Sequence, residues 1–163
     1  DNVVLGLGDN GVVHAVRSSF AEVARSAGAQ RTAARARQAL AEVGLAAVAD
    51  KPAGGLSLGD QRRLEIARAI VSRPRLILLD EPVSGVAQEE EQQIAQLLLR
   101  LNREHGIAML LIEHNIAFVR SLCDTMSVMA AGRIIAQGDP DTVIGLPAVR
   151  EQYFGELDAD AAA

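Results

Sequence analysis

Apolar residues recur at helical spacing over the first part of the chain. Segments 12–27 and 32–43 carry an apolar side chain at every third or fourth position, with Arg and Glu between them. Gly44 follows the second segment, where a helix typically ends. Residues 1–7 fit the tail of a further helix. The pattern therefore predicts a helical, polar-faced region at the beginning of the sequence.

Beyond residue 50 the pattern changes. Residues 51–55 predict a loop, because Pro and Gly are frequent there, and a helix is predicted over 61–72, ending before Pro74. Apolar runs then alternate with helical patterns. Strands are predicted at 76–79, 108–112, 126–129 and 133–136, and helices at 88–104 and 116–122. The last two strands flank Ala131-Gly132, which is typical of a hairpin turn. Apolar strands alternating with helices predict an α/β fold with a parallel sheet covered on both faces.

Composition narrows the class of protein. A chain of 163 residues can bury a core of its own, and since aromatic residues are only 2%, that core is built from Leu, Ile, Val and Ala. The net charge of −5 argues against non-specific nucleic-acid binding. The single cysteine, Cys123, excludes an internal disulfide and fits a small buried apolar position. No apolar run approaches the roughly 20 residues of a membrane helix, and no signal peptide is visible.

Two acids follow the apolar run 76–79 directly. Asp80 and Glu81 are therefore predicted at the carboxyl end of a central strand, where parallel α/β sheets bind ligands. In nucleotide hydrolysis the first acid can hold Mg²⁺ and the second can orient the attacking water. The alternative is a strand that ends in a solvated turn, and the two acids alone do not decide between these interpretations.

A second candidate site precedes the helix at 61–72. Ser57 and Gly59 offer a hydroxyl and backbone N–H groups at a helix start, where the helix dipole favours an anion. This is a device that can bind phosphate. The alternative is an ordinary capped helix with Ser57 or Asp60 as the N-cap.

A histidine follows the predicted strand at 108–112. His114 would lie at the same edge of the sheet as the acidic pair, where it can donate a hydrogen bond to a terminal phosphate. A purely structural role for a histidine at a strand end is the alternative.

The order and spacing of these three motifs resemble the second half of ABC ATPases. Residues 56–61, Leu-Ser-Leu-Gly-Asp-Gln, resemble the signature loop of that family, and residues 76–81 resemble its Walker B strand with the catalytic glutamate. His114 resembles the switch histidine. The loop Ser84-Gly85-Val86-Ala87 falls where the family has its D-loop, although Ala87 replaces the usual Asp or Asn.

The resemblance implies a P-loop NTPase-like fold with ATP and Mg²⁺ as cofactors. It implies catalytic roles for Glu81 and His114, and a metal-binding role for Asp80. Family members act as head-to-tail dimers in which each signature loop faces the ATP held by the partner subunit. The residues implied in nucleotide binding are Ser57, Leu58, Gly59, Asp60, Gln61, Ser84 and Gly85. The signature loop departs from the family where Asp60 replaces a Gln or Glu.

Three further segments favour a narrower group. Residues 60–68, 132–138 and 149–155 resemble the ATPases of branched-chain amino acid importers. That resemblance implies ATP hydrolysis coupled to import of branched-chain amino acids or related solutes. It implies a second ABC ATPase subunit, transmembrane permease subunits and, indirectly, a periplasmic or extracellular solute-binding protein. The expected location is peripheral, on the cytoplasmic face of the membrane. A non-transport ABC ATPase of DNA repair is disfavoured, since one cysteine and no heptad array are present.

The phosphate-binding loop of the family has no counterpart in these residues. No Gly-x-x-x-x-Gly-Lys-Ser/Thr string occurs, and residues 1–3 resemble the stretch just past the glutamine loop. We therefore expect a partial helical subdomain at 1–55, the later part of the catalytic core at 56–145, and a C-terminal helix and tail at 146–163. The chain alone is expected to be inactive. The alternative function is a non-catalytic module that supplies its signature loop to a complete partner ATPase.

Overall fold

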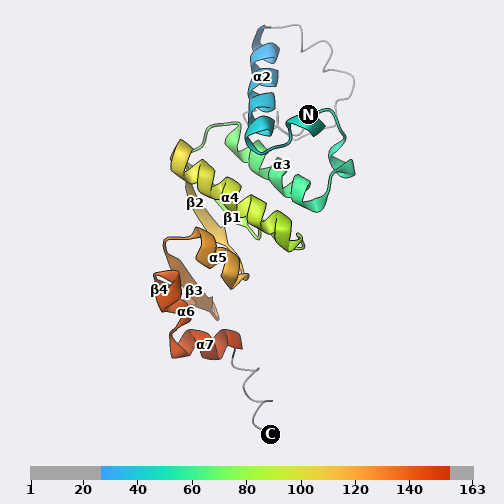
Figure 1. Cartoon of the computed structure of the whole chain (residues 1–163). Coiled ribbons are helices and arrows are strands. Elements are labelled where there is room, and N and C mark those ends of the chain that lie inside the picture. The colour runs from blue at the N-terminus through green and yellow to red at the C-terminus, as the bar shows by residue number, and fades with distance from the viewer. Residues whose placement is uncertain (1–26, 155–163) are drawn as a thin grey trace. The chain divides into compact units, whose positions relative to one another are not determined.

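The computed structural model describes residues 27–154, which Figure 1 draws as a coloured ribbon. The chain divides into two compact units between Ile112 and Glu113. The helices predicted over 1–7 and most of 12–27, and the tail from residue 157 onward, lie outside the described residues. The predicted domain limits at 55/56 and 145/146 stay predictions. None of the described helices is both long and apolar enough to cross a membrane.

The described part of the first unit, residues 27–112, contains three α-helices and two short 3₁₀ turns. These elements are α2 (Ala27–Glu42), η2 (Ala46–Val48), η3 (Ala53–Gly55), α3 (Leu58–Ile70) and α4 (Gln88–His105). Figure 1 shows α3 packed against both α2 and α4. The helices predicted over 32–43, 61–72 and 88–104 are confirmed, with α2 and α3 each beginning a few residues earlier than expected.

The longest described helix, α4, owes its position to one apolar face. Ile94, Leu98 and Leu101 lie on this face and are at most 1% exposed. Glutamates fill the first turn, where negative charge complements the helix dipole. Gly106 ends the helix in the left-handed conformation at φ +64°, where its N–H group donates to the carbonyls of the last turn.

Among residues 27–112, two parallel strands form a sheet. β1 (Leu76–Asp80) pairs with β2 (Ala108–Ile112), and the register runs from Leu76 opposite Ala108 to Asp80 opposite Ile112. Helix α4 connects the two strands, as a parallel pair requires. The predicted parallel α/β arrangement is confirmed, and both strands end at the same edge of the sheet.

The prediction that this sheet is covered on both faces is wrong for the described residues. Ile77 and Leu79 are buried, but the alternate positions on β1 and β2 are not. Side chains on successive strand residues point to opposite faces. The exposed apolar positions are Leu76 at 54%, Leu78 at 70%, Leu110 at 60% and Ile112 at 62%. Within residues 27–154, the core of the first unit therefore lies on one side of its sheet.

The second unit is a hairpin flanked by short helices. Its elements are α5 (Ile116–Leu122), β3 (Met126–Ala130), β4 (Arg133–Gly138), α6 (Pro140–Ile144) and α7 (Pro147–Phe154). The predicted hairpin is confirmed: β3 and β4 are antiparallel, and Ala131 and Gly132 both have positive φ at the turn. Val128, Val143 and Val149 form the core of this unit. Helix α6 was not predicted, because five residues are too few to show helical periodicity.

Cys123 is half-buried at the end of α5, whereas a buried position was predicted. Burial, and next the carboxylate of Asp124, raise the pKa of its thiol above the ordinary value. A raised pKa lowers the thiolate fraction at any given pH, and the thiolate is the reactive form. Alkylation of the folded chain by iodoacetamide at pH 8 is therefore expected to be slower than alkylation of the urea-unfolded chain.

Replacing Asp124 with Asn is expected to raise this alkylation rate in the folded state, without reaching the unfolded rate, because burial is the larger cause. Asp50→Asn, which removes an exposed acid in the first unit, serves as the control. An Asp124→Asn rate equal to that of the control would contradict the electrostatic contribution.

Candidate functional site

The first turn of α3 is organised by Ser57. This residue is the N-cap: it has extended backbone angles, and its Oγ accepts a hydrogen bond from the N–H of Asp60 at 3.1 Å. The helix therefore begins where an N-cap serine predicts, and an N-cap of this kind contributes about 1 kcal/mol. The capping interpretation of Ser57 is confirmed for the described structure. It does not exclude a second use of the hydroxyl, because capping engages only its acceptor side.

The donor side of the same hydroxyl points to Glu90. Ser57 Oγ donates to Glu90 Oε1 at 3.1 Å, although the two residues are 33 positions apart. Gly59 lies under this carboxylate. A Cβ built on Gly59 would fall 2.5 Å from Cδ and Oε1 of Glu90 and 2.8 Å from its Oε2. The absence of a side chain at Gly59 is therefore what admits the Glu90 carboxylate to the start of α3.

The remaining predicted residues of the signature loop make contacts within the chain. Gln61 Nε2 donates to the carbonyl of Leu56 at 3.1 Å, and Asp60 Oδ1 forms an ion pair with Arg63 at 3.1 Å. Leu58 is 41% exposed, and one of its methyl groups lies 3.2 Å from the point where a Cβ on Gly85 would be. The structure thus brings Leu58 next to Gly85, although α3 and β1 separate the two residues in the sequence.

The acidic pair stands at the carboxyl end of β1, as the sequence predicts. Asp80 is the last strand residue and Glu81 the first beyond it, and both are exposed. The N–H of Glu81 donates to the carbonyl of Ile112 at 2.9 Å, and the carbonyl of Glu81 accepts from Ser84 N at 3.1 Å. Glu81 has φ +45°, a conformation that is strained for a residue with a side chain. Such strain is found preferentially at functional sites.

The D-loop candidates continue from this turn. Ser84 is partly buried and Gly85 has φ +74°, a left-handed conformation that favours glycine. Ala87 is the N-cap of α4 and makes no side-chain capping hydrogen bond. The three glutamates that follow in the first turn of α4 supply the negative charge that a capping Asp would otherwise have brought.

His114 follows Glu113, the first residue of the second unit, and is held by this neighbour. Its side chain is 70% exposed, whereas the side chain of Glu113 is 1% exposed. The Glu113 carboxylate accepts the backbone N–H groups of His114 at 3.1 Å and Asn115 at 3.3 Å, and Nδ1 of His114 lies 3.9 Å from the same carboxylate. Asn115 in turn caps α5 through the N–H of Phe118. His114 is thus presented to solvent on a turn that a buried carboxylate fixes.

Asp80 is the predicted metal ligand, and its surroundings limit how a metal can bind. No cluster of three His, Cys, Asp or Glu side chains suited to a metal occurs among the residues that the structure describes. A single exposed carboxylate suits Mg²⁺, which commonly takes one or two protein carboxylates and completes its octahedron with phosphate oxygens and water. Asp80 therefore fits a magnesium ion that arrives with a nucleotide, and does not fit a metal held by the protein alone.

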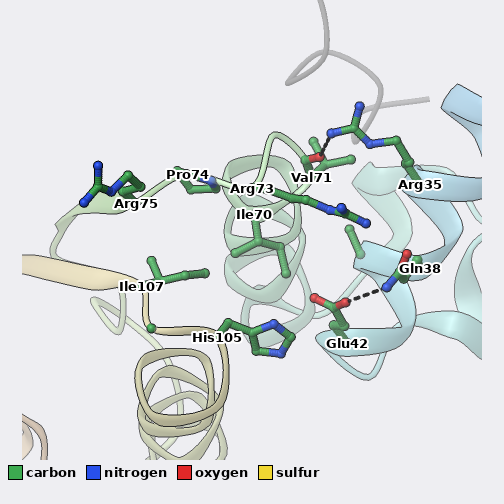
Figure 2. A pocket seen from close by; sticks show the side chains of 12 residues that line it. Arg35, Gln38, Glu42, Ile70, Val71, Arg73, Pro74, Arg75, His105 and Ile107 are labelled. Carbon is green, nitrogen blue, oxygen red and sulfur yellow. Dashed lines mark hydrogen bonds between the residues drawn. The ribbon is translucent and has the colours of Figure 1, made fainter.

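A hollow of about 360 Å³ lies at the opposite end of α3. Figure 2 shows Arg35 hydrogen-bonded to the carbonyl of Val71, and Gln38 to Glu42, at its rim. A 13-residue helix rises about 20 Å, so this hollow is remote from Ser57. None of the predicted site residues lines it. The candidate site is therefore an open surface at the N-terminal end of α3 and the carboxyl edge of the sheet.

Sequence reasoning missed two residues, one beside the signature loop and one beside His114. Glu90 contacts Ser57 and Gly59 through the fold rather than through sequence proximity, and an acid in the first turn of a helix normally signals only dipole stabilisation. Glu113 holds the turn of His114, and its position directly after an apolar strand was the available signal. An acid at such a strand end either meets solvent or accepts backbone N–H groups, and the sequence alone does not distinguish these outcomes.

Comparison with known proteins agrees with these motifs. The ABC transporter family profile matches residues 7–84. The chain is 41% identical over 117 residues to the high-affinity branched-chain amino acid transport ATP-binding protein BraF of Pseudomonas aeruginosa, covering 72% of this chain and 46% of that protein. It is 37% identical over 122 residues to the lipopolysaccharide export system ATP-binding protein LptB of Acidithiobacillus ferridurans, covering 75% and 50%. The chain spans about half the length of these relatives.

The fold has solved counterparts. The ADP conformation of MJ1267, an ATP-binding cassette of an ABC transporter, superposes with a TM-score of 0.70 at 36% identity, covering 75% of this chain and 49% of that one. The similarity in sequence and the similarity in fold point to the same class of protein.

Proposed function

Since the chain belongs to the family of ABC transporter ATP-binding proteins, we propose that it forms the signature-loop and Walker B part of an ATPase that drives solute import through a membrane permease. One observation carries the proposal. The Ser57-capped start of α3 and the acidic turn at the end of β1 belong to one compact unit, and Leu58 packs against Gly85 between them. Ser84 and Gly85 lie where they would complete the nucleotide surface.

The proposed roles follow from chemistry at each position. Glu81 orients and polarises the attacking water, because its exposed carboxylate stands at the edge where parallel sheets bind ligands. Asp80 holds Mg²⁺, which neutralises charge on the phosphates when it is bound. His114 donates a hydrogen bond to the terminal phosphate, which its exposure and its fixed turn favour. The signature-loop residues Ser57, Leu58, Gly59, Asp60 and Gln61 face the nucleotide of a second ATPase subunit.

The solute and the remaining partners belong to the proposal as well. Segments 60–68 and 132–138 favour branched-chain amino acids or related solutes, and BraF is named for such transport. LptB, which is nearly as similar, is named for lipopolysaccharide export, so the family alone does not select the solute. We place the protein on the cytoplasmic face of the membrane, bound to permease subunits and, through them, to a solute-binding protein.

The direct test is ATP hydrolysis by the longest native polypeptide that contains these residues. We expect Mg²⁺-dependent activity, and we expect Ser57→Ala to lower it about tenfold at limiting ATP, the effect of one lost hydrogen bond to a charged group. Ser72→Ala is the matched control, because Ser72 lies at the other end of α3 and its hydroxyl donates to the carbonyl of Ala69. Absence of hydrolysis, or equal activity in both variants, would overturn the proposal.

One result would favour the alternative function. If the polypeptide is inactive alone but raises the activity of a complete ABC ATPase, and Ser57→Arg removes that gain, the protein acts as a non-catalytic donor of its signature loop. The retained N-cap geometry of Ser57 and the lack of a phosphate-loop motif in these residues make this a defined alternative.

A further inference from the structure

The start of α3 already holds an anion, and that anion is a side chain of the same protein. Glu90 lies in the first turn of α4, and its carboxylate reaches the first turn of α3. It therefore stands near the N-terminal ends of two helices, each of which carries partial positive charge. The Ser57 hydroxyl donates to it, and Gly59 leaves room for it.

We propose that Glu90 is a built-in competitor of the nucleotide phosphate at the signature loop, which must release Ser57 before phosphate can bind there. The proposal rests on the function proposed above, since it concerns the same loop. The hydroxyl of Ser57 has one hydrogen to donate. While its acceptor side caps α3 and its hydrogen points to Glu90, a phosphate oxygen gains no hydrogen bond from it.

The negative charge of Glu90 also opposes phosphate binding, in addition to its hydrogen bond with Ser57. A carboxylate over Gly59 repels an approaching phosphate, and it occupies the space above the backbone that glycine keeps open. The Glu90 side chain is only partly buried, so its displacement into solvent is inexpensive. Glu90 therefore weakens nucleotide binding at this loop without blocking it, which raises the nucleotide concentration needed to occupy the loop.

Substitution of Glu90 tests this inference in the longest native polypeptide that contains these residues. Glu90→Gln keeps the shape and removes the charge, and we expect the KM for MgATP to fall about fivefold with kcat within twofold. Glu90→Asp keeps the charge but is one methylene shorter. It loses the contact with Ser57, so its KM should fall between those of the wild type and Glu90→Gln. Glu89→Gln is the matched control, since it removes the same charge from the same helical turn.

The outcomes separate this inference from the proposed function. A wild-type protein that neither binds nor hydrolyses MgATP overturns both. If the wild type hydrolyses ATP but Glu90→Gln and Glu89→Gln have equal KM values, only the competition is overturned. A higher KM in Glu90→Gln would also overturn it, because Glu90 would then be a residue that positions Ser57 for phosphate. Thermal unfolding of each variant verifies that the fold is retained.

Discussion

Glu81→Gln is expected to slow Mg²⁺-dependent ATP hydrolysis at least about 10²-fold, while the affinity for nucleotide changes little. Gln has the shape of Glu but cannot accept a proton from the attacking water. Glu81 lies one residue beyond β1, and its backbone is held by hydrogen bonds to Ile112 and Ser84. Because these two hydrogen bonds involve only the backbone, they do not depend on the identity of the side chain at position 81.

The measurement is single-turnover hydrolysis by the longest native polypeptide, together with equilibrium binding of MgATP. Glu104→Gln, an exposed acid in the last part of α4, provides the control for a change in net charge. Activity of Glu81→Gln within a few-fold of this control would show that another group orients the water. A parallel loss of nucleotide binding would assign Glu81 to binding rather than to the chemical step.

Local patterns predicted the elements that place this turn. The apolar run before Asp80 and the helical periodicity of residues 88–104 were sufficient to predict β1 and α4. A buried strand or helix face produces a local pattern of apolar residues, and this pattern is visible in the sequence. Ser57 as an N-cap was equally readable, since capping is a contact between residues three positions apart. The position of Asp80 and Glu81 at the end of β1 was predicted from the apolar run that precedes them.

Contacts between segments that are distant in the sequence could not be predicted from local patterns. The hydrogen bond between Ser57 and Glu90 depends on how α3 packs beside α4. Taken alone, Ser57 is explained as the N-cap of α3, and Glu90 as an acid that complements the dipole of α4. The exposure of Leu78 is another case. An unbroken apolar strand predicts burial on both faces, but the described residues place side chains over only one of them. The sequence shows that the strand side chains are apolar and favour burial. Whether they are buried depends on which segments pack against each face of the sheet.

The same contrast gives the largest expected change in stability. Leu98→Ala is expected to lower the free energy of unfolding of the first unit by about 2–5 kcal/mol. Leu98 lies on the buried face of α4 and is 0% exposed. The substitution removes buried apolar groups and leaves a cavity that the surrounding core fills only in part. Urea unfolding followed by far-UV circular dichroism measures the loss.

Leu78→Ala is the matched control, because it makes the same chemical change on a side chain that is 70% exposed. In the 163-residue chain it should cost about 0.5 kcal/mol, since the leucine already meets water in the folded state. Equal losses for Leu98→Ala and Leu78→Ala would contradict the one-sided core. A large loss for Leu78→Ala alone would mean that the outer face of the sheet is covered in solution, for example by self-association. Sedimentation at two protein concentrations would then show whether self-association covers this face.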